Sequence, residues 1–199
     1  MILPPDAVLY DRETIWNLSE KLGMRSNSQL AHEIELALPI ELTLEEQVEL
    51  LREFVMENFI SLNMAADISI HYAGERNHHA HIMIPTRIID NNGFGKINRE
   101  FNDYKNLELW RKGWAEIQNR EFENKGFDVR VSHESYMVQD FDKSVKREPT
   151  EKLGKKATAL ERRGIKTDRG NENRKIIERN NKKLERNELK RDKSRTYER

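Results

Sequence analysis

The order of apolar and polar residues over roughly the first 145 positions predicts a mixture of helices and strands. Apolar residues recur at helical spacing in three segments, and glycines at positions 23 and 126 mark the ends of the first and the third. The predicted helices are Asp11–Leu22, Leu44–Leu62 and Asn106–Asn124. Alternating or short apolar runs that end at turn residues predict strands. The predicted strands are Glu33–Pro39, Ile68–Tyr72 and Ala80–Thr86.

Weaker patterns fill the intervals between these elements. We expect a short helix from Ser26 into Ala31, a loop marked by Asn91-Asn92-Gly93 and Gly95, and a short last strand at Val129–Val131. Thr43 and Glu46 form a capping box, in which hydroxyl and carboxylate satisfy each other's backbone amides, so the second long helix should begin there.

The pattern changes at Lys143. A linker around Pro149 is followed by a predicted short helix, Lys155–Arg163, and then by a stretch from Asn171 that has only four aliphatic residues. Such a stretch buries little apolar surface, so we expect an exposed helix or disorder there. The sequence therefore predicts an α+β domain with an antiparallel central sheet at residues 1–142, and a basic linker and helical tail at 143–199.

The formal net charge of zero conceals a split along the chain. Residues 1–145 hold 15 basic and 25 acidic side chains, whereas residues 146–199 hold 20 basic and 10 acidic ones. An acidic body with a basic tail of net charge +10 favours contact with nucleic acid through that tail. The chain has no cysteine, no apolar run of about 20 residues and no secretory signal at its start. We therefore expect a soluble cytoplasmic protein with no membrane partner.

Candidate chemistry is concentrated in the segment HYAGERNHHAHIM, which holds four of the six histidines. His79 and His81 are two residues apart on a predicted strand, so both side chains point to one face, and His78 points to the other. Antiparallel pairing across a short turn brings His71 beside them. Three imidazoles on one face can bind a divalent cation and leave positions open for a substrate. Imidazoles alone do not identify the metal, and a zinc hydrolase has the same ligand set.

Several strings together resemble the MobA/MobL family of plasmid mobilisation relaxases, from near residue 1 to about residue 175. The histidine motif is shared with HUH nucleases in general, and the flanking strings make the resemblance specific to this family. These strings are DRETIW, EIELALP, LTLEEQ, the spacing H-x7-HAHIM, NLELWRKGWAEIQN, EPTEKLG and LERRGIKTDRG.

The resemblance implies a nickase of single-stranded DNA at a plasmid transfer origin. By match to the motif, His71, His79 and His81 hold a divalent metal ion, Mg²⁺ or Mn²⁺ with Zn²⁺ as the alternative, which polarises the scissile phosphate. A tyrosine attacks and keeps the 5′ end as a phosphotyrosine. The family places that tyrosine on an N-terminal segment before the point at which this chain resembles it. We therefore expect metal and single-stranded DNA binding with weak or no strand transfer, and name none of the five tyrosines as the nucleophile.

Further candidate residues follow from the same resemblance and from position. Glu33 and Glu35 share a strand face, where a carboxylate can orient a histidine or transfer a proton, and we select Glu35 as the catalytic candidate. Asp67 is a weaker candidate of this kind, and His133 and Tyr136 match a family string near the last strand. The candidate DNA contacts are Arg87, Arg162, Arg163 and Lys166.

Two other functions stay open at this point. A non-catalytic DNA-binding protein would bind DNA regardless of chelator or of the histidines. A metal-dependent hydrolase unrelated to DNA would not bind single strands. The partners expected under the leading hypothesis are single-stranded origin DNA and other relaxosome proteins.

Overall fold

The computed structural model describes residues 1–23, 25–72, 77–140 and 145–197. These residues form two compact units, which divide between His133 and Glu134. The first unit contains a sheet and the long helices that the sequence predicts, and the second is helical. The expected α+β class with an antiparallel sheet is confirmed.

The first unit is built on a three-stranded antiparallel sheet with the order β1-β3-β2. The strands are β1 (Ala31–Ala37), β2 (Asp67–Tyr72) and β3 (His78–Pro85). The central strand β3 pairs with both neighbours without a register shift. Because successive side chains of a strand alternate between faces, this continuous register also fixes which residues share a face.

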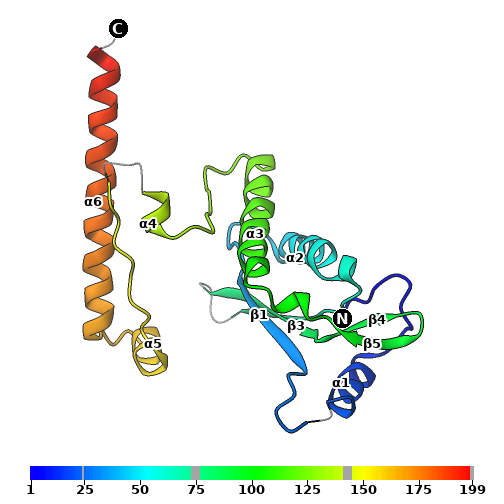
Figure 1. Ribbon diagram of the computed structural model, residues 1–199. Coiled ribbons are helices and arrows are strands. Elements are labelled where there is room, and N and C mark those ends of the chain that lie inside the picture. Colours follow the sequence, from blue (N-terminus) through cyan, green and yellow to red (C-terminus); the bar gives the residue numbers. More distant parts are fainter. Residues whose placement is uncertain (24, 73–76, 141–144, 198–199) are drawn as a thin grey trace. The chain divides into compact units, whose positions relative to one another are not determined.

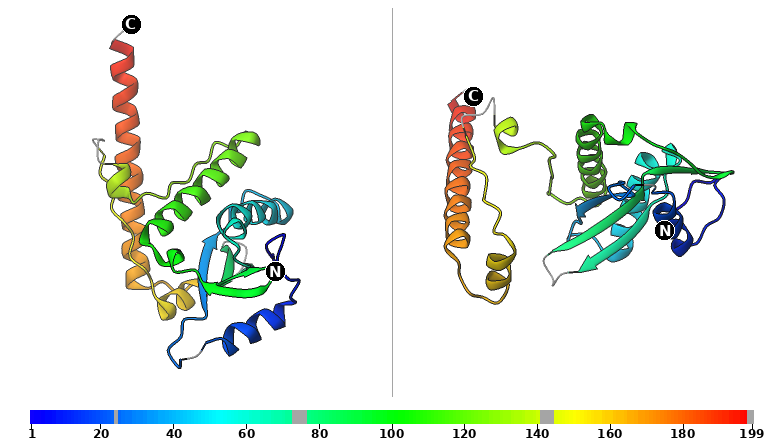
Figure 2. Two further views of the ribbon diagram at one scale, coloured as in Figure 1. Left: turned by 45° about the vertical axis from the view of Figure 1, so that its right-hand side comes forward. Right: turned by 60° about the horizontal axis from the view of Figure 1, so that its bottom comes forward.

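Two long helices cover one face of this sheet (Figure 1, Figure 2). They are α2 (Leu44–Asn58), followed by the short 3-10 helix η1 (Ile60–Leu62), and α3 (Tyr104–Asn124), preceded by η2 (Glu100–Asn102). The predicted capping box is present at the start of α2. The core between sheet and helices contains buried side chains from the sheet and from both helices, among them Phe54, Phe59, Ile82, Ile84 and Ile117.

The other face of the sheet is covered at one end by α1 (Arg12–Lys21), whose N-cap Asp11 accepts a hydrogen bond from the Thr14 amide at 2.7 Å (Figure 1). A separate hairpin, β4 (Arg87–Asp90) and β5 (Gly93–Ile97), packs with α1 in a second small apolar cluster.

Three of the sequence-based expectations are wrong. Residues 26–30 form no helix, because the Ser28 hydroxyl accepts from the Arg25 amide in a turn and β1 begins at Ala31. The loop expected at Asn91–Gly95 is shorter than predicted. Asn91 and Asn92 alone form the turn, and β5 begins directly after them at Gly93, whose φ is 97°. Val131 joins no strand, because the Asn119 side chain of α3 bonds both its N–H and its C=O, each at 2.9 Å.

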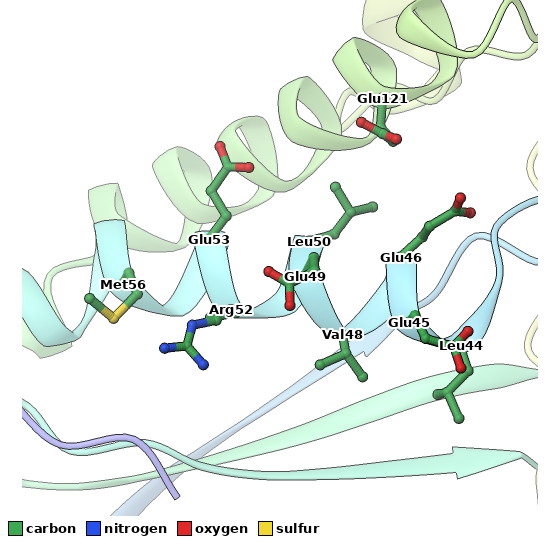
Figure 3. A pocket seen from close by; sticks show the side chains of 10 residues that line it. All are labelled: Leu44, Glu45, Glu46, Val48, Glu49, Leu50, Arg52, Glu53, Met56 and Glu121. Atoms are coloured by element: carbon green, nitrogen blue, oxygen red, sulfur yellow. The ribbon is translucent and has the colours of Figure 1, made fainter.

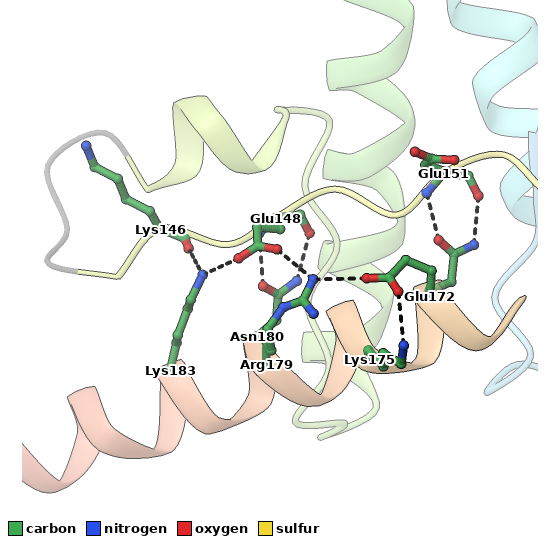
Figure 4. A network of polar contacts seen from close by, with 9 residues as sticks. Lys146, Glu148, Glu151, Glu172, Lys175, Arg179, Asn180 and Lys183 are labelled. Atoms are coloured by element: carbon green, nitrogen blue, oxygen red, sulfur yellow. Dashed lines mark hydrogen bonds and ion pairs between the residues drawn. The ribbon is translucent and has the colours of Figure 1, made fainter. Parts of the chain in front are cut away.

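The second unit contains α4 (Tyr136–Gln139), α5 (Lys155–Arg162) and the long helix α6 (Asp168–Tyr197). An extended strap before α5 lies along α6, where two asparagines of the helix each bond the N–H and the C=O of one strap residue (Figure 4). Asn173 holds Glu151 at 2.8 and 2.7 Å, and Asn180 holds Glu148 at 2.9 and 2.8 Å.

The spacing of these four residues explains why the two segments fit. Asn173 and Asn180 are seven residues apart, which is about 10.5 Å along a helix. Glu148 and Glu151 are three residues apart, which is about 10 Å along an extended chain. The Glu148 carboxylate also pairs with Lys183 and Arg179 at 2.8 and 3.0 Å (Figure 4), and these cations lower its pKa.

Candidate metal centre

The register of β2 and β3 brings three histidines together on one face of the sheet. His71 lies directly opposite His79, and His81 follows two residues later on the same face of β3. The ring centroids are 4.8 to 5.3 Å apart, and one ligand nitrogen from each ring lies within 4.8 Å of the other two. His71 is exposed and the other two are partly buried, so the group is open to solvent on the side away from the sheet.

Hydrogen bonds set the tautomer of two of these rings. His79 Nδ1 lies 2.9 Å from the carbonyl oxygen of Asn77, and His81 Nδ1 lies 2.7 Å from Glu33 Oε1. Both oxygens accept only, so in each neutral ring Nδ1 carries the proton and Nε2 keeps its lone pair. An oxygen that accepts from the Nδ1–H of the ring is the usual partner of a metal-binding histidine. The residues present therefore fit a divalent cation held through ring nitrogens.

The carboxylate that contacts the triad belongs to Glu33, which lies two residues along β1 from Glu35, the residue selected as the catalytic candidate. Glu35 lies directly opposite His81 in the register, but the carboxylate that bonds this imidazole comes from Glu33, which lies diagonally across. The Glu33 side chain is 60% exposed, so it reaches back over the sheet to His81 from the solvent side. Glu35 lies on the same face, and its catalytic role stays a prediction.

Comparison with known proteins identifies the family. The MobA/MobL family profile matches residues 1–163. This chain belongs to the MobA/MobL family. A probable conjugal transfer protein TraA of Sinorhizobium fredii is 33% identical over 177 residues, and Mobilization protein A of Escherichia coli is 33% identical over 174 residues. These alignments cover 78% and 77% of the present chain, but only 16% and 24% of the two relatives. The MobA/MobL chain thus spans about a fifth of these relatives' length.

A solved structure gives the same result. A chain described under the molecular basis of vancomycin resistance transfer in Staphylococcus aureus is 36% identical, with a TM-score of 0.62. The similarity covers 68% of the MobA/MobL chain and 74% of the solved one. The relatives are proteins of plasmid conjugal transfer and mobilisation, as the sequence resemblance indicates. Among the described residues, no helix has the length and apolar character needed to cross a membrane.

The other histidines of the first unit of the MobA/MobL chain lie away from the triad. His78 faces the helices, as predicted, and contacts Tyr72 with ring centroids 4.5 Å apart, so Tyr72 also points away from the metal face. His32 stacks on Phe101 at 4.5 Å, and burial lowers its pKa, which favours the neutral ring. His133 lines a groove of about 530 Å³ beside β1 and α3.

The remaining candidate residues lie outside the triad. Arg87 lies in β4 and donates to the Gly95 carbonyl at 2.9 Å. Tyr136 belongs to the second unit, where the Arg147 guanidinium lies 4.2 Å from its ring centre. The cations proposed for DNA are exposed and have no ion pair in the part of the chain that the structure describes. They are Arg162, Arg163 and Lys166 of the second unit.

Asp67, a weaker candidate from the sequence, belongs to a polar cluster on the metal face whose other members, Arg12 and Trp16, were not predicted. Arg12 Nε and Trp16 Nε1 both donate to Asp67 Oδ2, at 2.6 and 3.0 Å. Arg12 and Trp16 are four residues apart, so they share one side of α1. Asp67 has the same strand parity as His71, which places it on the same face of β2. That parity was the signal available in the sequence.

A hollow of the first unit that is larger than the groove beside β1 and α3 is unrelated to the histidines. It measures about 850 Å³ and follows the solvent side of α2 (Figure 3), and its walls include Glu45, Glu49 and Arg52. The side chains drawn there spread along the helix and do not converge on one point (Figure 3). Two of its carboxylates, Glu46 and Glu53, are already paired with Lys125 and Arg120 of α3. Size alone therefore does not mark the site in this protein.

Proposed function

We propose that this chain binds single-stranded DNA of a plasmid transfer origin on the open face of its sheet. In this proposal, His71, His79 and His81 hold a divalent metal ion there, as the DNA-processing part of a mobilisation relaxase. The observation that supports it most is the convergence of three imidazoles, two of which, His79 and His81, have tautomers that leave Nε2 available. Membership of the MobA/MobL family supports DNA as the substrate in this proposal.

Each residue near the triad has a proposed task. When bound, the cation would supply Lewis-acid polarisation of the scissile phosphate. Mn²⁺ and Zn²⁺ suit three nitrogen donors better than Mg²⁺, which prefers oxygen. Glu33 holds the His81 ring through Nδ1, and Glu35 is the candidate for proton transfer on the same face. We assign no attacking tyrosine among the described residues.

The proposed DNA contacts outside the triad are cationic. Arg162, Arg163 and Lys166 follow each other around the turn between α5 and α6. Glu161 fixes this turn, because its carboxylate accepts from the Thr167 amide and hydroxyl at 2.6 and 2.9 Å and from Arg174 at 2.8 Å. The Glu161 carboxylate is thus occupied, and the three exposed cations, which have no ion pair among the described residues, are proposed to bind phosphates, with Arg87 of the first unit as a further contact. The resulting binding should weaken steeply with salt.

The test is a gel-shift titration of a labelled single-stranded 30-mer with and without MnCl₂, repeated with EDTA. The proposal predicts binding that Mn²⁺ strengthens in the wild type and not in H79A/H81A. The control variant H78A removes an imidazole of the same strand from the opposite face and should keep the Mn²⁺ response. Binding that ignores both chelator and H79A/H81A would instead support a non-catalytic DNA-binding protein.

Two further readouts use the same samples. Mn²⁺ binding without any shift of the oligonucleotide would support a hydrolase unrelated to DNA. A band that survives denaturing electrophoresis would show a covalent adduct, and mass spectrometry of that band would then assign the attacking residue.

A further inference from the structure

The polar cluster of Arg12, Trp16 and Asp67 has an unusual distribution of exposure. The Asp67 side chain is 4% exposed, whereas the Arg12 side chain is 64% exposed. A buried carboxylate needs hydrogen-bond donors, and Asp67 has two on a single oxygen. The Asp67 carboxylate thus accepts from two donors of α1, while most of the Arg12 side chain is exposed to solvent.

A second arginine–aspartate pair shows what a purely structural arrangement looks like in this chain. In the second unit, Arg147 binds both oxygens of Asp140 through Nε and Nη2, and its side chain is 17% exposed. Arg12 instead uses only Nε. Among the described residues, neither Nη group of Arg12 has an acceptor. The Arg12 guanidinium is therefore fixed through Nε, while its two Nη groups stay available to a ligand.

The position of this fork relates it to the histidines. Asp67, Ser69 and His71 alternate onto the same face of β2, and Asp67 lies opposite Met83, two residues beyond His81. The anchor of Arg12 is thus about 7 Å along the strands from the His81 row and about 14 Å from the His71–His79 row. One strand of duplex DNA has about one phosphate per 3.4 Å of axis, and a more extended single strand has fewer, so the separation corresponds to at most about two to four nucleotides.

We propose that Arg12 is a phosphate-binding residue, anchored by Asp67, which holds the DNA strand a few nucleotides from the metal centre. A guanidinium fixed through Nε presents its two Nη groups as a pair, the geometry that binds phosphate oxygens bidentately. Asp67 and Trp16 act as positioning residues, because Asp67 holds the arginine and Trp16 donates to the same Asp67 oxygen. This inference rests on the proposed function, since it needs DNA on the metal face.

The test compares Arg12→Gln with wild type in binding a fluorescent 30-mer of oligothymidylate over a range of NaCl concentrations. Glutamine keeps a donor for Asp67 and removes the charge. We expect about tenfold weaker binding, as for the loss of a charge-assisted contact. The plot of log K against log salt should become less steep by about 0.7, the value for one phosphate on a single strand. Arg12→Lys should retain the slope and recover only part of the affinity.

Arg52→Ala is the matched control, because Arg52 is an exposed arginine of α2 over the other face of the sheet. It should leave affinity and slope unchanged, and Mn²⁺ affinity should be unchanged in both variants. Phenylglyoxal modification of the wild type, read by mass spectrometry, tests the same contact without any substitution. Oligothymidylate should protect Arg12 and leave Arg52 reactive.

Two outcomes separate the hypotheses. If the wild type binds the oligonucleotide but R12Q matches R52A and Arg12 is not protected, only the role of Arg12 is refuted. If the wild type does not bind oligothymidylate at all, the proposed function fails together with this inference.

Discussion

The contact between Glu33 and His81 leads to a prediction that separates two glutamates on one strand. Glu33→Gln keeps the size of the side chain and removes the charge that holds the His81 Nδ1 proton across 2.7 Å. Loss of the group that hydrogen-bonds a metal-binding histidine typically costs 10- to 100-fold in metal affinity. The Glu33 side chain is 60% exposed, and solvent screens its charge, so we expect the lower end, about tenfold.

The assay is a competition titration of Mn²⁺ against a chelator of known affinity, with folding verified by circular dichroism. Glu35→Gln is the matched control, because Glu35 lies opposite His81 on the same face but, among the described residues, makes no hydrogen bond to it. E35Q should bind Mn²⁺ like the wild type and lose strand cleavage wherever cleavage is measurable. Equal Mn²⁺ affinity in E33Q and wild type, or an equal loss in E35Q, would refute the assigned roles.

Three predictions concern the stability of the two units. Phe54→Ala removes a fully buried ring that contacts Phe59 and Trp114, and should lower the free energy of unfolding by about 3–5 kcal/mol in urea titrations. Asn180→Ala deletes both bonds to the Glu148 backbone, so hydrogen exchange of the Glu148 amide should accelerate; unchanged exchange would argue against the strap. The Arg174 ion pair, followed by the Thr167 bonds, lowers the pKa of Glu161 to about 2. Its contribution to stability is therefore complete above about pH 4.5 and is lost as the pH falls towards 2. The Thr167 amide chemical shift of the folded protein should titrate with a midpoint near pH 2 in the wild type but not in E161Q.

The convergence of the three histidines was predictable from the sequence because strand alternation is a strong geometric rule. His79 and His81 share a parity, and a short connection makes an antiparallel partner of the strand that carries His71, so the triad follows from three positions and a turn. The same rule places His78 and Tyr72 on the far face. The start and cap of α2 were predictable for a similar reason, since Thr43 and Glu46 satisfy the first amides of the helix locally, whereas α2 ends at Asn58 and not at the predicted Leu62.

Contacts between distant elements were not predictable in this way. The choice of Glu33 over Glu35 depends on how far a flexible side chain reaches diagonally across two strands. The burial of Asp67 depends on where α1 docks on the sheet, which no local pattern specifies. Val131 resembles a strand residue in sequence, but the amide of Asn119 takes the place of a strand partner. In each case a side chain distant in sequence decides the outcome.

The central claim is tested most directly by a crystal structure of the protein with Mn²⁺, in which anomalous scattering at the manganese edge locates the ion. We predict one strong anomalous peak surrounded by ring nitrogens of His71, His79 and His81. The same peak should be absent in H79A/H81A. A peak only in the acidic hollow along α2, at Glu45 and Glu49, or no peak on the open face of the sheet, would contradict it.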